Sequence, residues 1–312
     1  MTTSVSRREG KKIVVVGSIN ADLTTRVARH PHPGETLMGT GGTFSAGGKG
    51  ANQAVAAALL GGDVAMVGAV GADPQAEAAL THLRRSGLDM RAVATTTEPT
   101  GLAVITVSAS GENTIVVLPG ANATVTASYV DQHAELIRGA DIVLLQGEIP
   151  ASGFDRAVEL AAGRVVVNLA PVVPVGKQRL LEANPLLANE HEAALVLEQL
   201  ERPHESDDPH QLARELREAG FQTVVLTLGA AGALVADEQG LTEIPTPKVQ
   251  PVDTTGAGDA FAGALVTRLS EGDGLVDAAR FAARVGAAAT LARGAQDSYP
   301  AAGEQLPEVE NS

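Results

Sequence analysis

The chain has 312 residues, with 23 basic and 37 acidic side chains, a formal net charge of −14 and a hydrophobic fraction of 44%. That apolar fraction indicates a globular protein, and the length suffices for one large α/β domain or two smaller ones. The absence of cysteine excludes disulfides and thiolate chemistry. The acidic charge and the scarcity of aromatic residues, two Tyr and five Phe, argue against nucleic acid as a partner.

No targeting or membrane-spanning segment stands out. Only five apolar or glycine residues, 13–17, follow the basic residues of the N-terminal region, whereas a signal peptide needs a longer apolar run. The largely apolar run over 219–236 contains Gly229 and Gly232 between two apolar halves, which favours strand–turn–strand over a membrane helix. We therefore expect a soluble, cytoplasmic protein without a membrane partner.

Short apolar runs alternate with alanine- and leucine-rich stretches along the chain. Predicted strands, in chain order, are Lys12–Gly17, Val64–Gly68, Leu102–Val107, Thr114–Leu118, Asp141–Gln146, Val165–Leu169, Thr223–Leu228 and Ala233–Ala236. Predicted helices are Ala51–Leu60, Pro74–Ser86, Ala151–Ala162, Glu190–Leu200, Pro209–Ala219, Asp259–Leu269 and Leu275–Ala292. The alternation predicts a single α/β domain over 11–302 with a mostly parallel sheet, flanked by flexible tails at 1–10 and 303–312.

Two segments interrupt this alternation of strands and helices. Residues 22–46 are rich in Gly, Thr and Pro and contain no clear helical pattern, and residues 95–124 predict two strands around a turn at 110–113. We expect these two segments to form a small antiparallel sheet that projects from the main domain. Long non-helical insertions in compact α/β domains are usually functional, which favours a lid over a plain extension of the sheet edge.

The strongest local signal is the sequence DTTGAGD at 253–259, which opens a predicted helix. Its small residues Gly256, Ala257 and Gly258 let backbone N–H groups converge at the helix N-terminus, which makes an anion site. Asp259 is either an ordinary helix cap or a general base, and a cap needs no Gly-Ala-Gly before it, so the base is favoured. In phosphoryl transfer such a base accepts the proton of the acceptor hydroxyl, while the amides hold the migrating group.

Three further stretches place polar groups in turns. The glycine-rich turn at 47–50 fails the Walker A pattern, yet it allows close approach to a ligand, with Lys49 and Asn52 as donors. Asn20 and Asp22 follow the first strand, where they either grip adjacent hydroxyls of a polyol or form an Asx turn. The sequence NEHE at 189–192 begins a helix, and solvated acids at a helix start are its commoner explanation.

These stretches occur together in a recognisable order. The motifs are GSINAD at 17–22, PGET at 33–36, GGKGANQAVA at 47–56, NEHE at 189–192, TLGAAG at 227–232, DTTGAGD at 253–259 and GAQ at 294–296. In these motifs and their order the chain, from about 13 to 300, resembles the ribokinase/phosphofructokinase-B family of carbohydrate kinases.

The resemblance implies a Rossmann-like (ribokinase-like) α/β domain whose β-sheet lid also serves as a dimer interface, so a homodimer is expected. The implied reaction is transfer of the γ-phosphoryl group of ATP to the 5-hydroxyl of D-ribose, with Mg²⁺ and a monovalent cation, K⁺, as cofactors. A related kinase for deoxyribose, a nucleoside or a keto-sugar is the nearest alternative. A non-catalytic, sugar-binding regulator on the same fold is a more distant one.

The resemblance also implies roles for individual residues. Asp259 matches the catalytic base, and Gly256, Ala257 and Gly258 match the anion hole. The ribose-contacting positions are Asn20, Asp22, Gly48, Lys49, Asn52, Glu148 and Asp259. The ATP site comprises Asn189, Thr227, Leu228, Gly229, Ala230, Ala231, Gly232, Gly258 and Ala283, with Glu192 as the magnesium-associated acid. The monovalent-cation ligands are Asp253, Thr255, Ala289, Ala292, Gly294 and Ser298, mostly through backbone carbonyls.

Ala283 departs from the family pattern, in which His or Asn often stands beside the adenine. Adenine would then be held by apolar packing. The predicted lid contains one aromatic residue, Phe44, which disfavours a nucleoside acceptor, and it lacks the basic cluster that a sugar phosphate would need. A small neutral polyol is the acceptor that fits best.

Overall fold

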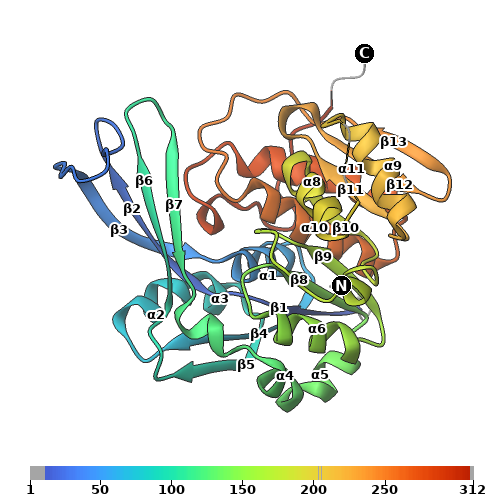
Figure 1. The fold of residues 1–312 in the computed structure, drawn as a ribbon, viewed down its shortest axis with the longest axis horizontal. Helices are drawn as coiled ribbons and strands as arrows, with labels where there is room; N and C mark the ends of the chain where they lie inside the picture. Colours follow the sequence, from blue (N-terminus) through green and yellow to red (C-terminus); the bar gives the residue numbers. More distant parts are fainter. Residues whose placement is uncertain (1–10, 203, 205, 310–312) are drawn as a thin grey trace, which may run out of the picture.

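The computed structural model describes residues 11–202, 204 and 206–309, and two β-sheets organise them (Figure 1). Within these residues the larger sheet has nine strands in the order β13-β12-β11-β10-β9-β8-β1-β4-β5, parallel from β11 to β5 and antiparallel at β12 and β13. Its strands are β1 Lys12–Val16, β4 Asp63–Gly71, β5 Asp89–Thr96, β8 Ile142–Gln146, β9 Arg164–Asn168, β10 Leu186–Asn189, β11 Val224–Thr227, β12 Ala233–Asp237 and β13 Gly240–Ile244. The mostly parallel α/β architecture predicted from the sequence is confirmed.

Helices cover both faces of this sheet. Their bounds are α1 Lys49–Leu59, α2 Pro74–Ala79, α3 Thr81–Ser86, α4 Ala127–Gln132, α5 Ala134–Arg138, α6 Ala151–Leu160, α7 Lys177–Leu180, α8 Glu190–Gln199, α9 Pro209–Ala219, α10 Ala257–Glu271 and α11 Leu275–Ala289. Short 3₁₀ turns lie at Gly120–Thr124, Gly229–Ala231 and Gln296–Ser298. One apolar core lies under α1, α2, α3, α10 and α11, and the other under α4 to α9.

The unbroken apolar strands supply both cores at once. Ile13 and Val15 of β1 belong to the core under α1 and α10, whereas Val14 and Val16 belong to the opposite core. All four side chains are fully buried. Because successive side chains of a strand point to opposite faces, a run without polar residues fits only a strand that is covered on both sides.

The smaller sheet has the strand order β3-β2-β6-β7, with bounds β2 Asn20–Arg26, β3 Thr40–Gly47, β6 Gly101–Val107 and β7 Asn113–Leu118. It projects beside the larger body, as Figure 1 shows. The predicted pairing is wrong in one respect, because β2 and β6 run parallel while the outer pairs are antiparallel. This sheet is therefore mixed, since each hairpin is antiparallel within itself and the two hairpins meet through strands of the same direction.

The structure revises two further expectations. The single helix predicted over 74–86 is divided into α2 and α3 at Leu80. In place of the frayed tail expected from Gly303, the residues up to Val309 are described, and Leu306 is buried against the core. The Arg284 side chain donates to the carbonyls of Leu306 and Pro307, which fixes this segment on α11. The predicted tail at 1–10 and residues 310–312 lie outside the described residues.

No helix in the described part of the chain is long and apolar enough to cross a membrane.

Candidate active site

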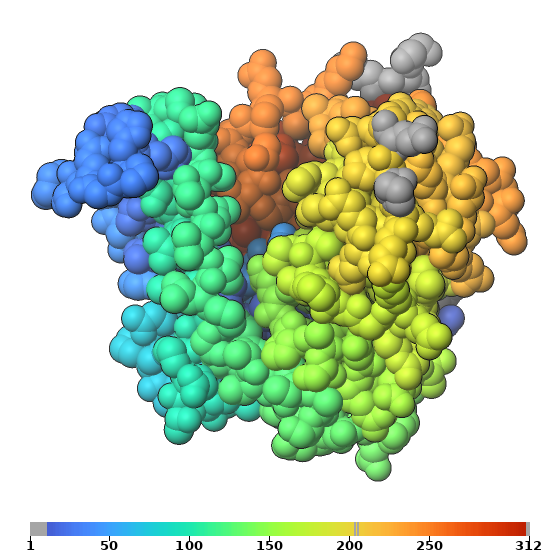
Figure 2. All heavy atoms as spheres, viewed as in Figure 1, coloured from blue at the N-terminus to red at the C-terminus, as the bar shows by residue number. Residues whose placement is uncertain are grey.

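The predicted site residues gather where the parallel strands end. The chain turns from β1 into the small sheet at Asn20, Glu148 follows β8, and Asn189 closes β10. Ligands of open α/β sheets bind at the carboxyl edge of the strands. Figure 2 shows the surface hollowed between the small sheet and the C-terminal part of the chain, in orange and red. The candidate site therefore lies at the carboxyl edge of the larger sheet, next to the small sheet and helix α10.

Asp259 lies in the first turn of α10 and is 7% exposed. Its two carboxylate oxygens accept separate hydrogen bonds, Oδ2 from Asn52 Nδ2 and Oδ1 from Gln53 Nε2, both at 2.9 Å. Both donors belong to α1, so the packing of α1 on α10 sets the orientation of the carboxylate. A plain helix cap would accept from the backbone of its own helix, and Asp259 instead accepts from another element.

The turn before Asp259 requires glycine at Gly256, the N-cap of α10, which has φ of 75°. A Cβ there would lie 2.6 Å from both the Ala295 Cβ and the Tyr299 hydroxyl. The Ala257 N–H donates to Thr254 O at 3.2 Å, so this amide of the predicted anion hole is engaged within the turn. Gly258 opens onto free space, and amides in the first turn of a helix lack intrahelical partners.

The glycine-rich turn before α1 packs directly on the segment after β1. Added Cβ atoms would lie 2.7 Å from Asn20 N at Gly48, and 2.6 Å from Ser18 N at Gly50. Lys49, between them, faces the carboxylates, and the charge of Asp259 is the largest cause that raises its pKa. The two glycines therefore bring the motifs at 17–22 and 47–53 together, as the sequence alone could not show.

Asp22 and Glu148 add two carboxylates to this cluster. Glu148 Oε2 accepts hydrogen bonds from Ser18 Oγ at 2.5 Å and from Lys49 N at 3.0 Å. Burial, followed by the charges of Glu148 and Asp259, raises the pKa of Asp22 from 3.8 to about 7. Asp22 Oδ1 is buried and has no hydrogen-bond partner among the described residues. A buried, unpaired acceptor of this kind suits a ligand hydroxyl.

Asn20 is oriented by a residue that the sequence analysis missed. Asn122, in the 3₁₀ turn that closes the small sheet, donates from Nδ2 to Asn20 Oδ1 at 2.7 Å. Its own Oδ1 accepts from Ile19 N at 2.9 Å. Asn122 is 1% exposed, so these bonds form away from water. The return of the chain from the small sheet is thereby locked onto the loop after β1.

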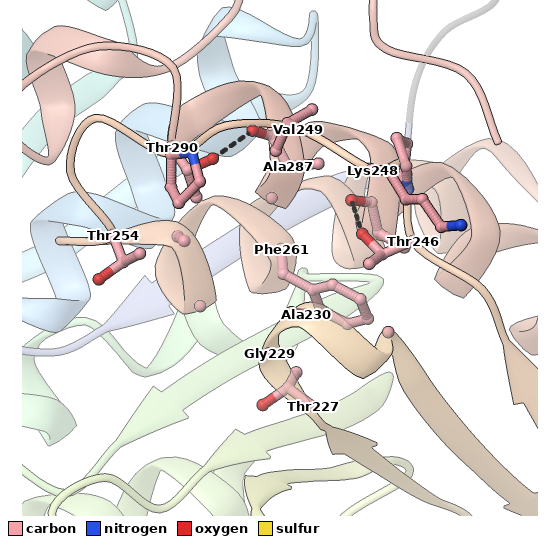
Figure 3. Close-up of a pocket in the computed structure, with 17 residues that line it drawn as sticks. Thr227, Gly229, Ala230, Thr246, Lys248, Val249, Thr254, Phe261, Ala287 and Thr290 are labelled. Carbon is pink, nitrogen blue, oxygen red and sulfur yellow. Dashed lines mark hydrogen bonds between the residues drawn. The ribbon is translucent and has the colours of Figure 1, made fainter. Parts of the chain in front are cut away.

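A cavity of about 430 Å³ opens beside the first turn of α10. Its lining residues are Thr227, Gly229, Ala230, Gly232, Thr246, Pro247, Lys248, Val249, Pro251, Thr254, Ala257, Gly258, Phe261, Ala283, Gly286, Ala287 and Thr290. Six of the nine residues predicted for the ATP site line it, including Gly258 and Ala283, whereas Asn189, Leu228 and Ala231 do not. The 246–251 loop and Phe261 were not predicted. Figure 3 shows the Phe261 ring projecting from α10 towards the turn at Gly229 and Ala230.

Asn189 and Glu192 form a reciprocal cap of α8. Asn189 Oδ1 accepts from Glu192 N at 2.8 Å, and Glu192 Oε2 accepts from Asn189 N at 3.0 Å. Burial raises the pKa of Glu192, against the opposing effects of this hydrogen bond and of the Lys49 charge. Asn189 and Glu192 thus cap the start of α8, as the helix-start explanation of NEHE expects. The cap also holds the Glu192 carboxylate close enough to Lys49 for the two charges to interact.

Asp253 joins the turn before α10 to the loop after α11. Its Oδ1 accepts from Thr255 N at 3.0 Å and from Thr255 Oγ1 at 2.6 Å, and its Oδ2 accepts from Gly294 N at 3.0 Å. Burial alone would raise the pKa of Asp253, but these hydrogen bonds outweigh it and lower the pKa. Three of the six residues predicted for the monovalent cation are therefore linked by one carboxylate.

Across residues 11–202, 204 and 206–309, no three His, Asp or Glu side chains gather in a position to hold a metal ion. Mg²⁺ commonly keeps several waters and binds through one or two carboxylates together with substrate phosphates, so such a cluster is not a requirement of every magnesium site.

Comparisons with known proteins agree with this geometry. Residues 10–302 match the model of the pfkB family carbohydrate kinases. The chain belongs to this family. A ribokinase of Haemophilus influenzae is 37% identical over 306 residues, covering 97% of this chain and 99% of its own. The ribokinase structure from Thermotoga maritima has a TM-score of 0.86 at 32% identity, covering 93% of this chain and 96% of its own. The Arabidopsis thaliana ribokinase complexed with ribose and ATP has a TM-score of 0.84 at 31% identity, covering 94% and 96%.

In this carbohydrate kinase several buried polar residues escaped the sequence analysis. Gln53 donates to Asp259, and Asn122 donates to Asn20. Gln296 donates to Asn52, and the Tyr299 hydroxyl donates to Gly256 O at 3.1 Å. The available signal was weak: Gln53 and Gln296 lie within the motifs at 47–56 and 294–296, but nothing in the sequence places those motifs beside Asp259.

Proposed function

We propose that the chain catalyses ATP-dependent phosphorylation of D-ribose at its 5-hydroxyl. One observation carries the proposal. The Asp259 carboxylate lies at the start of α10, between the cavity that Gly258 lines and the polar cluster that contains Asp22, Lys49 and Glu148. A nucleotide in the cavity and a sugar at the cluster would meet at this carboxylate. The ribokinase names of the relatives support ribose as the sugar.

The acceptor side suits a small neutral polyol. We assign the sugar contacts to Asn20, Asp22, Gly48, Lys49, Asn52, Glu148 and Asp259. Carboxylates accept hydrogen bonds from sugar hydroxyls, and the Lys49 ammonium and the Asn52 amide donate to them. The unpaired Oδ1 of Asp22 supports this role, because a hydroxyl donor would remove the cost of leaving it buried alone.

In the chemical step, Asp259 accepts the proton of the attacking hydroxyl. Its two hydrogen bonds from α1 fix the plane of the carboxylate before the sugar arrives. The amides of Gly256, Ala257 and Gly258 stabilise the charge of the migrating phosphoryl group at the N-terminus of α10. Ala257 N must give up its long bond to Thr254 O to take part.

On the nucleotide side, we assign adenine to the cavity beside Ala283, which is 4% exposed. Ala283 and Phe261 offer apolar contact rather than a hydrogen bond. Asn189 lies outside the cavity lining and would act at the phosphate end, next to Glu192. The chain carries net negative charge, so polyanion binding depends on oriented amides and a bound cation rather than on a basic surface.

Two cations fit this arrangement. Glu192 would help to hold Mg²⁺, which when bound would neutralise charge on the phosphates. Asp253, Thr255, Ala289, Ala292, Gly294 and Ser298 would hold K⁺, mostly through carbonyl oxygens, which are the ligands that hard cations prefer. The Asp253 carboxylate, which joins the two loops, supports this second assignment.

We assign a lid and a homodimer interface to the small sheet. Its edge strand β7 exposes Ile115, Val116, Val117 and Leu118, each between 44% and 58%. Contiguous exposed apolar residues mark interaction surfaces in soluble proteins. We also propose a cytoplasmic location for the reaction.

The proposal is tested by ATP consumption with D-ribose, 2-deoxyribose, fructose or adenosine, each with and without K⁺. Turnover should be highest with ribose and rise with K⁺. Asp259→Asn should lower kcat by roughly 10²–10⁴, the range expected for loss of a general base, and leave ribose binding largely intact. A higher rate with another acceptor would assign that acceptor as the substrate and leave the proposed role of Asp259 unchanged. No turnover with any of them would favour the sugar-binding regulator.

A further inference from the structure

Gln296 is a buried amide that reaches the reacting carboxylate through one intermediary. It lies in the 3₁₀ turn after α11 and is 3% exposed. Its Nε2 donates to Asn52 Oδ1 at 2.8 Å, and Asn52 Nδ2 donates to Asp259 Oδ2 at 2.9 Å. Residue 296 is thus connected to Asp259 although it does not itself line the nucleotide cavity.

The chemistry of the carboxylate fixes the direction of this chain of hydrogen bonds. An ionised carboxylate only accepts, so Asn52 must turn its NH₂ group towards Asp259. The Asn52 oxygen then faces the opposite way, where it needs a donor, and Gln296 supplies one. A second chain has the same direction: Gln146 Nε2 donates to Gln53 Oε1 at 2.7 Å, and Gln53 donates to Asp259 Oδ1.

The other end of the Gln296 amide shows that folding alone does not explain the residue. Its Oε1 is buried without a hydrogen-bond partner among the described residues. Leaving this acceptor unpaired costs stability, whereas an apolar side chain of the same size would instead leave the Asn52 oxygen without its donor. What position 296 gains from glutamine is therefore the donor directed at Asn52.

We propose that Gln296 is a positioning residue for phosphoryl transfer, because it holds Asn52, and through it Asp259, in the orientation that accepts the hydroxyl proton. This rests on the proposed role of Asp259. The same segment also donates from Gly294 N to Asp253 and from the Tyr299 hydroxyl to Gly256 O. One short segment after α11 thereby touches the cation loop, the anion hole and the support of the base.

The direct test is a double-mutant cycle of Gln296→Met with Asn52→Ala. Methionine keeps the length and apolar volume of the side chain and removes the donor. Gln296→Met should lower kcat roughly 10- to 100-fold, the scale of a small misplacement of a catalytic group, with the KM for ATP within about twofold of wild type. In the Asn52→Ala background, the same substitution should cause no further loss, since its route to Asp259 is already cut.

Thr267→Val is the matched control, because Thr267 is buried in α10 and its hydroxyl donates only within the packed core, to Gly263 O and Ala57 O. It should lower the Tm by a similar amount and leave kcat unchanged. Equal losses of kcat from Gln296→Met in both backgrounds, or an unchanged kcat, would overturn the proposal.

A second measurement needs no turnover. The Asn52 side-chain amide hydrogen that is bonded to Asp259 Oδ2 should exchange slowly in the unliganded wild type, as followed by NMR, and faster in Gln296→Met but not in Thr267→Val. Rapid exchange in the wild type would itself overturn the proposal. The cycle uses whichever acceptor the wild type phosphorylates, so an error in the assignment of ribose appears as a different acceptor and leaves the comparison of variants intact.

Discussion

Asp22 is a candidate site residue whose ionisation is strongly altered by its surroundings. Burial and the nearby charges of Glu148 and Asp259 raise its pKa to about 7. Sugar hydroxyls donate more strongly to an ionised carboxylate than to a protonated one, so ribose binding should release the Asp22 proton. We expect ribose affinity to weaken as the pH falls below 7, approaching about tenfold per pH unit. Isothermal titration between pH 6 and 8 measures this change.

The unliganded protein should show the opposite dependence in its stability. The pKa of Asp22 is higher in the folded chain than its ordinary value of 3.8, so the folded state binds this proton more tightly. The stability contributed by this group is therefore present at low pH and is lost as the pH rises towards 7. Asp22→Asn should flatten both profiles. Equal ribose affinities at pH 6 and pH 8 in the wild type would contradict the linkage.

At the scale of residues, the sequence predicts side chains within a motif and misses those that support it. Asp259, Lys49 and Asn52 follow from local patterns of glycine and polar residues. Gln53 and Gln296 could not be found in this way, because their partners Asp259 and Asn52 are 206 and 244 positions away along the chain. The packing of α1 on α10 brings Gln53 to Asp259, and the packing of the 3₁₀ turn after α11 on α1 brings Gln296 to Asn52.

At the scale of elements, one carboxylate couples the turn before α10 with the loop after α11. Asp253→Ala removes the hydrogen bonds to Thr255 and Gly294 and one anionic ligand of the proposed cation site. We expect the activation by K⁺ to fall about tenfold, on the scale of a lost charged hydrogen-bonding group, with the KM for ribose changed by less than about threefold. Titration of kcat with KCl measures the difference.

Asp297→Ala is the control for this prediction. Asp297 lies in the loop after α11 that contains Gly294, but its carboxylate pairs with His82 of α3 at 2.8 Å. The Asp297 side chain is 58% exposed. Removal of this surface charge should leave the response to K⁺ unchanged. A K⁺ titration of Asp253→Ala that overlays that of the wild type would take Asp253 out of the cation site.

The sequence predicts strand bounds best for strands whose two faces are both buried. The strands β1, β8 and β9 are unbroken apolar runs, and the structure has them within one or two residues of the predicted bounds. The strands for which no bounds were predicted are short, glycine-rich or mixed in polarity: β2 and β3, which lie largely in the segment expected to join the small sheet, and β5, β10 and β13. Strand β2, NADLTTR, contains the site residues Asn20 and Asp22, so its polar residues obscured its strand character.

At the scale of the whole molecule, the small sheet presents a run of exposed apolar side chains on one of its strands. Four consecutive residues of β7, from Ile115 to Leu118, are exposed, so both faces of this strand are apolar and open. Strand β7 is also the edge of its sheet, with backbone groups available on one side. Such an edge pairs readily with another chain unless something covers it. A second copy of the chain, set against this sheet, would bury the exposed faces.

A charge on β7 should therefore separate the proposed dimer. Because neighbouring residues point to opposite faces, Val116→Glu and Val117→Glu test the two faces independently. We expect the wild type to sediment as two chains and at least one variant to sediment as one. Val309 is an exposed apolar residue near the C-terminus, so the control variant Val309→Glu should sediment as two chains. The dissociated variant should also show a raised KM for ribose, because the small sheet borders the hollow in Figure 2 and loses its support. A wild type that sediments as a single chain, or dimers that persist in both variants, would exclude β7 from the interface.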